Sequence, residues 1–158
     1  MKDTLPITLR GKKKLEDELK KLVSIERPEV IRLIEAARAN GDLSENADYD
    51  AAKERQAWIE SRVQEIQNHL AGAEVVDTSK IKSDRVVFGA HVKIMDQEDD
   101  KQYTYQIVGV DEADVNQGKI SIVSPLARAL IGKVAGDVVE VKTPASEKEY
   151  EILSFRFE

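Results

Sequence analysis

Apolar positions divide the chain into two halves with different periodicities. Between Gly41 and Gly72 the apolar residues recur every three or four positions, which is the spacing of one face of an α-helix. The seam that they form, in which Gln56 alone is polar, comprises Tyr49, Ala52, Gln56, Ile59, Val63, Ile66 and Leu70. This spacing predicts a helix with a coiled-coil seam over about three heptads.

An earlier segment, near residues 12–40, predicts a second helix. Its helically spaced apolar residues are Leu15, Leu19, Leu22, Val30, Leu33, Ile34 and Ala37. Pro28 interrupts the series near Glu26. Because a proline inside a helix removes a hydrogen bond and clashes with the preceding turn, we expect a kink or local irregularity there. Two helices joined by a short turn fold back antiparallel, so we expect a hairpin about 43 Å long. No third helix is available to cover the seam, which predicts a protruding rod with an exposed tip.

The turn between the helices contains residues suited to ending one helix and starting the next. Gly41 suits the left-handed conformation that ends the first helix. Asp42, or Ser44, can cap the second helix, and Asp42 with Glu45 has the spacing of a capping box. A purely structural role therefore explains these two acids without any chemistry.

The second half of the chain predicts a small antiparallel β-sheet with one short helix. Stretches rich in β-branched and aromatic residues occupy 86–95, 103–110, 119–123, 137–142 and 149–157, and polar or glycine-containing turns separate them. The short helix is expected at 125–131, with Ser124 as its N-cap and Pro125 as its first residue. Residues 73–84 are interpreted as a linker, and the predicted domains are 1–78 and 79–158. The expected fold class is α+β.

Composition excludes several classes of function. The 158 residues include no cysteine, which removes disulfides, thiolate nucleophiles and cysteine-based zinc sites. The two histidines, His69 and His91, are too far apart for a standard two-histidine zinc motif. No apolar segment approaches the roughly 20 residues of a membrane span, so we expect a soluble, cytoplasmic protein with no membrane partner. A net charge of −6 argues against a general polyphosphate-binding surface, although it leaves room for a local basic patch. An aromatic content of 5% is low for a protein that stacks bases or sugars.

Charge is concentrated at the predicted tip. Residues 1–40 hold ten Lys or Arg against seven Asp or Glu, whereas residues 41–52 hold four acids and no base. Carboxylate oxygens are ligands for Mg²⁺, which usually keeps several waters. An exposed tip encloses nothing, so it would bind Mg²⁺ weakly alone. If these acids take part in chemistry, the rest of the active site must belong to a partner.

Residues 41–49, with the sequence Gly-Asp-Leu-Ser-Glu-Asn-Ala-Asp-Tyr, resemble the tip signature of the bacterial Gre transcript cleavage factors. The resemblance extends along the whole chain in the same order, through Ile7-Thr-Leu-Arg-Gly11, Glu26-Arg-Pro-Glu29, Phe88-Gly-Ala90, Ile107-Val-Gly-Val-Asp-Glu-Ala113, Ser124-Pro-Leu-Ala-Arg-Ala-Leu-Ile-Gly132 and Lys142-Thr-Pro144. The sequence Leu-Ile-Gly-Lys at residues 130–133 favours the GreA branch over the GreB branch, and so does the lack of a heavily basic rod.

The resemblance implies an N-terminal coiled-coil hairpin, a C-terminal FKBP-like domain and binding to bacterial RNA polymerase. In this family the hairpin enters the polymerase's secondary channel and stimulates the polymerase's own cleavage of the 3′ end of backtracked RNA, so that arrested elongation resumes. The two catalytic acids of the family motif fall on Asp42 and Glu45. They would help to hold a Mg²⁺ ion shared with the polymerase. The chain alone would then have no complete active site and no stably bound cofactor.

Other residues have a structural and a functional interpretation side by side. Arg38, Lys53 and Arg55 could contact phosphates of the nascent RNA, or be ordinary solvated charges. The family's polymerase-docking region corresponds to Ser124, Pro125, Leu126, Ala127 and Arg128, which could equally form a structural helix over the sheet. Tyr49 is expected to pack at the tip or to stack near the RNA end, and Trp58 to pack beside the seam.

Three other functions stay open at this point. The hairpin could occupy the channel and inhibit polymerase, although intact tip acids favour stimulation. A free-standing hydrolase is disfavoured because paired catalytic carboxylates flank an enclosed substrate, and a hairpin tip encloses none. A prolyl isomerase is disfavoured because the segment after Ser79 has no tryptophan and no recognisable aromatic pocket.

Overall fold

The computed structural model describes residues 5–41 and 46–158. They form two compact units, each with its own internal packing. The first unit comprises Lys12–Gly72, and the second joins residues 5–11 to Ala73–Glu158. The predicted α+β class, with helices first and a sheet second, is confirmed.

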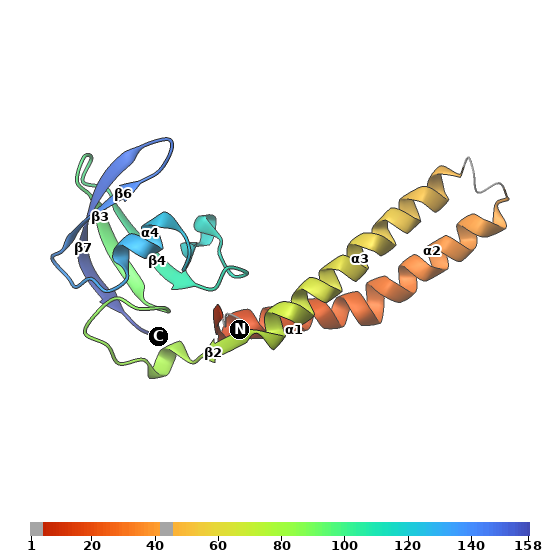
Figure 1. Ribbon diagram of the computed structural model, residues 1–158, viewed down its shortest axis with the longest axis horizontal. Coiled ribbons are helices and arrows are strands. Elements are labelled where there is room, and N and C mark those ends of the chain that lie inside the picture. The colour runs from red at the N-terminus through yellow and green to blue at the C-terminus, as the bar shows by residue number, and fades with distance from the viewer. Residues whose placement is uncertain (1–4, 42–45) are drawn as a thin grey trace. The chain divides into compact units, whose positions relative to one another are not determined.

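The first unit is a helical hairpin, as the apolar spacing predicts. Helices α1 (Leu9–Lys21) and α2 (Arg27–Ala39) run in succession, and α3 (Ala47–Ala71) returns alongside them (Figure 1). The seam buries Leu15, Leu22, Val30, Ile34, Ala37, Ala52, Ile59, Val63 and Ile66. The prediction that Leu33 belongs to the buried seam is wrong, because its side chain is 53% exposed. Its neighbour Ile34 takes the buried position instead, since a narrow two-helix seam accommodates only one of two adjacent residues.

The irregularity predicted near Pro28 is present as a π-helical segment, Leu22–Glu26, between α1 and α2. The backbone N–H of Arg27 donates to the carbonyl of Leu22, five residues earlier. Pro28 has no N–H to donate, and its ring clashes with the carbonyl four residues earlier in a regular helix, which accounts for an irregular turn at this place. Leu22 is nevertheless 1% exposed, so the seam continues through the irregular turn.

Within the described part of the hairpin, three ion pairs join its two helical arms outside the seam. Arg27 Nε lies 2.7 Å from Glu60 Oε1, and Arg62 Nη2 lies 2.8 Å from Glu18 Oε2. Arg55 pairs with Glu26. Exposed pairs of this kind contribute only about 0–1 kcal/mol each, so the seam carries most of the stability and the pairs favour one register.

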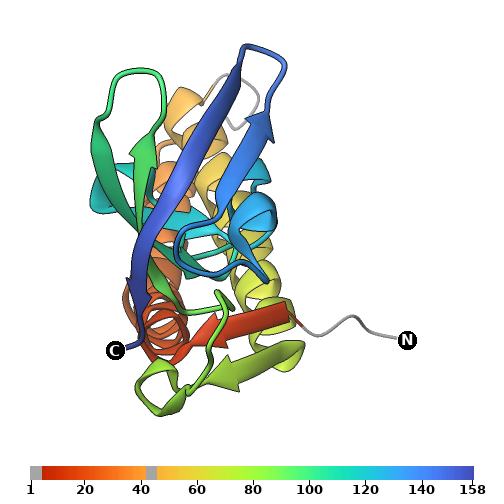
Figure 2. The same cartoon turned by 90° about the vertical axis from the view of Figure 1, so that its left-hand side faces the viewer.

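The second unit contains a five-stranded sheet with the order β5-β4-β3-β7-β6 (Figure 2). Its strands are β3 (His91–Asp96), β4 (Gln102–Val108), β5 (Lys119–Ser121), β6 (Val138–Lys142) and β7 (Glu147–Arg156). Neighbouring strands are antiparallel except β4 and β5, which are parallel. The expected purely antiparallel sheet is therefore wrong. The connection through 109–118 is long enough to bring the chain back to start β5 in the same direction as β4.

Helix α4 (Pro125–Leu130) packs on this sheet and confirms the expected short helix. Ser124 is its N-cap and accepts a hydrogen bond from the N–H of Ala127 at 3.3 Å. Ala127 and Leu130 are fully buried with the central strand residues Val92, Ile94 and Ile152.

A second, two-stranded sheet replaces the expected linker. Strand β1 (Leu5–Thr8) pairs in parallel with β2 (Ala73–Val76), and a short 3₁₀ turn, Thr78–Lys80, follows. Residues 73–84 are thus largely structured, contrary to expectation. Because β1 belongs to the second unit, the compact units do not follow a single cut in the chain. The division into domains 1–78 and 79–158 stays a prediction.

Candidate functional site

The candidate site lies at the end of the hairpin, where α2 stops and α3 begins. Gly41 follows the last residues of α2 with φ +108°, and its N–H donates to the carbonyl of Arg38 at 3.3 Å. A side chain is strained at this φ, which confirms the predicted role of Gly41 in ending the helix. Asp42, Ser44 and Glu45, to which the sequence assigned the cap and the chemistry, lie outside the described residues.

The cap of α3 is Asn46, not Asp42 or Ser44. The side-chain oxygen of Asn46 accepts a hydrogen bond from the N–H of Tyr49 at 3.1 Å, and α3 begins at Ala47. The predicted cap was therefore wrong. Asn, Asp and Ser cap helices about equally well, so residue type did not distinguish them. The acids Asp48 and Asp50 of the first turn were the available signal for a start at 46. Asp42 is consequently not required to cap α3.

The described acids of the tip are exposed. Asp48 and Asp50 lie in the first turn of α3, where carboxylates interact favourably with the positive end of the helix dipole by roughly 0.3–1 kcal/mol each. Tyr49, between them, is half-buried and starts the seam, in agreement with its packing interpretation. The end of the hairpin therefore presents negative charge to solvent.

The three bases near the tip differ in their surroundings. Arg38 is exposed in the last turn of α2, and Lys53 Nζ donates to Gln56 Oε1 at 3.0 Å. The guanidinium of Arg55 pairs with Glu26 and lies 4.4 Å from the ring centroid of Trp58. Trp58 is 48% exposed, so the expectation that it packs beside the seam is wrong; it forms a cation–π contact instead. Contact of these bases with RNA stays a prediction.

A hollow of about 350 Å³ lies beside the last turns of α2 and the first turns of α3. It is lined by Leu33, Ala36, Ala37, Asn40, Asp48, Ala51, Ala52 and Arg55. The small alanine side chains leave this space, and the half-exposed Leu33 borders it. The hollow is mainly apolar, so it suits packing against another surface better than binding an ion.

The predicted docking segment is divided between surface and core. Among its five residues, Pro125 and Arg128 are exposed, Ser124 and Leu126 are half-buried, and Ala127 is fully buried. Ser124 and Ala127 are occupied by the helix cap and the core respectively. A docking surface on α4 would therefore use Pro125 and Arg128, and docking itself stays a prediction.

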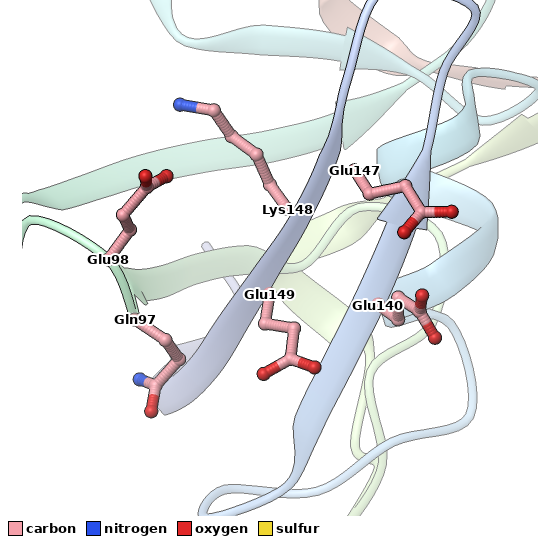
Figure 3. Close-up of a pocket in the computed structure, with 6 residues that line it drawn as sticks. All are labelled: Gln97, Glu98, Glu140, Glu147, Lys148 and Glu149. Atoms are coloured by element: carbon pink, nitrogen blue, oxygen red, sulfur yellow. The ribbon is translucent and has the colours of Figure 1, made fainter.

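A second hollow, of about 310 Å³, lies on the second unit beside the hairpin of β6 and β7 (Figure 3). Glutamates provide four of its six lining residues, which are Gln97, Glu98, Glu140, Glu147, Lys148 and Glu149. Lys148 Nζ lies 3.2 Å from Asp96 Oδ2. A hydrogen bond from the backbone N–H of Glu98 is the main cause that lowers the pKa of Asp96, and the Asp96 carboxylate raises the pKa of Lys148. The hollow is negative and unsuited to a nucleic-acid backbone.

Two family models match the chain. Residues 5–75 match the N-terminal region of the transcription elongation factors, and residues 81–157 match the C-terminal region of GreA/GreB. The chain belongs to the GreA/GreB family of transcription elongation factors. This confirms the family inferred from the tip and the other motifs.

Full-length relatives support the assignment. The chain is 55% identical over 150 residues to "Transcription elongation factor GreA" of Maricaulis maris, covering 95% of this chain and 96% of the relative. It is 56% identical over 155 residues to the protein of the same name from Ralstonia nicotianae, covering 98% of each. Among solved structures, the GreA factor homolog Gfh1 of Thermus thermophilus is similar over 97% of this chain and 99% of that one, with 24% identity and a TM-score of 0.45.

Within residues 5–41 and 46–158, no helix combines the length and the apolar character needed to cross a bilayer.

Proposed function

We propose that this chain binds bacterial RNA polymerase, inserts its hairpin into the secondary channel, and stimulates the polymerase's endonucleolytic cleavage of the 3′ end of backtracked RNA. Cleavage would provide a new 3′ end and rescue the arrested complex. The observation that carries the proposal is the identity of the α3 cap. Because Asn46 caps α3, the helix does not need Asp42 and Glu45 as its capping box, and a purely structural explanation of these two acids loses its main support. This partner would place the protein in the cytoplasm.

The chemistry of the donors fits a shared Mg²⁺. Asp42 and Glu45 would offer carboxylate oxygens, and Mg²⁺ is commonly held by one or two carboxylates together with phosphate oxygens. In such a site the metal neutralises charge and activates the attacking water. The chain would supply only these ligands and their position. The enclosing walls, the substrate and the remaining ligands would be those of polymerase, so the chain would not be an enzyme by itself.

The rest of the chain would position the tip. Pro125 and Arg128 are the exposed members of the segment proposed to dock on polymerase. Arg38 and Lys53, exposed on the hairpin near the tip, are proposed to contact phosphates of the extruded RNA. Arg55 is proposed to do the same, after release from Glu26.

The deciding experiment is cleavage in purified backtracked complexes with Asp42→Asn and Glu45→Gln beside the wild type. Each variant removes a charge and almost no volume. We expect near-complete loss of stimulated cleavage with polymerase binding retained. Asp48→Asn is the matched control, because Asp48 is an exposed acid of the same tip that is assigned no ligand role. Wild-type cleavage by Asp42→Asn would contradict the proposed metal role.

The same preparation distinguishes the alternative functions. A chain that inhibits polymerase would slow elongation without producing cleaved RNA. A free-standing nuclease would cleave RNA without polymerase, and a prolyl isomerase would turn over a standard proline peptide. We expect neither of these two activities above background.

A further inference from the structure

Asn46 forms hydrogen bonds to both helices of the hairpin. Its side-chain oxygen accepts from the N–H of Tyr49 in α3, at 3.1 Å. Its side-chain amide donates to the carbonyl of Ala37 in α2, at 2.7 Å. An ordinary N-cap makes only the first of these contacts, so the second requires a separate explanation.

The two contacts each involve one backbone group at a helix end. The first N–H groups and the last C=O groups of any helix lack partners within it. Tyr49 N–H is one of the former. Ala37 C=O lies in the last turn of α2 and also accepts from the N–H of Asn40 at 3.2 Å, so the side-chain amide of Asn46 is its second donor. Ala37 itself is 3% exposed, so its turn is held in the seam. A single amide therefore ties the end of α2 to the start of α3.

The Asn46 side chain thus links the two helix ends that flank the tip acids in the sequence. Asp42 and Glu45 lie in sequence between the two tied helix ends, and Gly41 fixes the direction in which the chain leaves α2. Catalytic ligands act only when they are held close to the productive geometry, and a displacement of about 1 Å can reduce a rate about a hundredfold. In general, a chain segment whose two ends are held has fewer positions available to it than one whose ends are free.

We propose that Asn46 is a positioning residue for Asp42 and Glu45, acting through the tie to Ala37 and not only through its cap of α3. This inference rests on the proposed function. It assigns to Asn46 no contact with metal or RNA.

Substitutions can separate the tie from the cap. Asn46→Asp and Asn46→Ser both keep an oxygen that caps α3. An aspartate carboxylate has no hydrogen to donate to Ala37, and serine is too short to span the same distance. Asn46→Ala removes both contacts. Asn68→Ser is the matched control, because Asn68 is exposed near the other end of α3 and its side-chain oxygen accepts from Gln64 of the same helix at 3.0 Å.

The first measurement is the rate of stimulated cleavage as a function of factor concentration. If the tie positions the acids, Asn46→Asp and Asn46→Ser lose about tenfold or more of the maximal rate, while the concentration for half-maximal cleavage stays within about twofold. Circular dichroism verifies that helix content is retained. If Asn46 is only a cap, Asp and Ser cleave like the wild type and Ala alone is impaired. A loss below about threefold in either variant would overturn the proposal.

The second measurement tests the tie without polymerase. The chain has no native cysteine, so spin labels can be placed at the exposed positions of Ala39→Cys and Ala47→Cys, which flank the segment. We expect a broader distribution of label separations with Asn46→Ser and Asn46→Asp than with the wild-type residue or Asn68→Ser. Label separations that are distributed alike in the Asn46 variants and the wild type would contradict the proposed link between Asn46 and Ala37. A wild-type chain that does not stimulate cleavage would instead refute the proposed function, and with it this role for Asn46.

Discussion

Glu112 accepts two hydrogen bonds from Thr8, although 104 positions separate them in sequence. One comes from the backbone N–H of Thr8 at 3.1 Å, and the other comes from its hydroxyl. A third hydrogen bond reaches the same carboxylate from the N–H of Gly109, at 3.0 Å. Both Thr8 and Glu112 are buried. This network joins strand β1 to the loop after β4 within the second unit.

Removing the Glu112 carboxylate should destabilise the second unit. Glu112→Ala leaves the buried N–H groups of Thr8 and Gly109 without their acceptor, which costs about 1–3 kcal/mol. Glu112→Gln keeps one oxygen for these two donors and should cost less than half as much. Chemical denaturation monitored by circular dichroism measures both. Equal losses in the two variants would contradict the assignment of the cost to the missing acceptor.

Gly11→Ala should destabilise the protein, although alanine in a helix is normally more favourable than glycine by about 0.5–1 kcal/mol. Gly11 lies in α1, and a Cβ added there overlaps the side chain of Glu112. Relieving this overlap should cost about 1–3 kcal/mol in unfolding free energy. Gly72→Ala is the control, because the nearest atom to its added Cβ is Asn68 O at an ordinary 3.5 Å.

The double variant Gly11→Ala with Glu112→Ala tests the cause of that cost. Truncating Glu112 removes the overlapping atoms, so the two losses should not add, and the double variant should lose less than their sum. Strictly additive unfolding free energies would show that the steric explanation is wrong.

Stability of the hairpin should depend on pH through Glu18. Arg62 donates to both carboxylate oxygens of Glu18 at 2.8 Å, and this hydrogen bonding lowers the pKa of Glu18 below its ordinary value of 4.5. Because the folded-state pKa is the lower one, the contribution is fully present above pH 4.5 and is lost as the pH falls through the folded value.

The measurement is the difference in unfolding free energy between the wild type and Glu18→Gln. For a partly exposed pair we expect about 0.2–1 kcal/mol at pH 7, decreasing as the pH falls below 4.5 and through the lowered folded-state pKa of Glu18. Glu54→Gln, at an exposed position of α3, should show no comparable decrease. A difference that grows on acidification would have the opposite sign to the one expected.

Arg128 should matter for polymerase binding and not for stability. It is exposed on α4, while its neighbour Ala127 is fully buried. We expect Arg128→Ala to raise the factor concentration for half-maximal cleavage several-fold, which corresponds to a loss of about 1 kcal/mol of binding free energy. The melting temperature should be unchanged. Lys93→Ala, at an exposed position of strand β3, is the control and should bind normally. Normal binding by Arg128→Ala would remove α4 from the proposed docking surface.

Local sequence patterns predicted the features that depend on neighbouring residues. The seam of α3 follows from its spacing of three and four, and the π-helical segment follows from Pro28. The end of α2 just before Gly41 and the cap of α4 by Ser124 follow from residue types with strong conformational preferences. The tip signature likewise indicated the family. Each of these signals lies within a few positions of the structure that it predicts.

Tertiary structure decided the features that depend on residues far apart in the chain. The pairing of β1 with β2, the parallel contact of β4 with β5, and the hydrogen bonds between Thr8 and Glu112 all join distant segments. The second contact of the α3 cap belongs to the same group, because Asn46 also donates to the carbonyl of Ala37 on the facing helix. A backbone group or a strand edge becomes an available partner only after the chain has folded, so composition and periodicity cannot identify it beforehand.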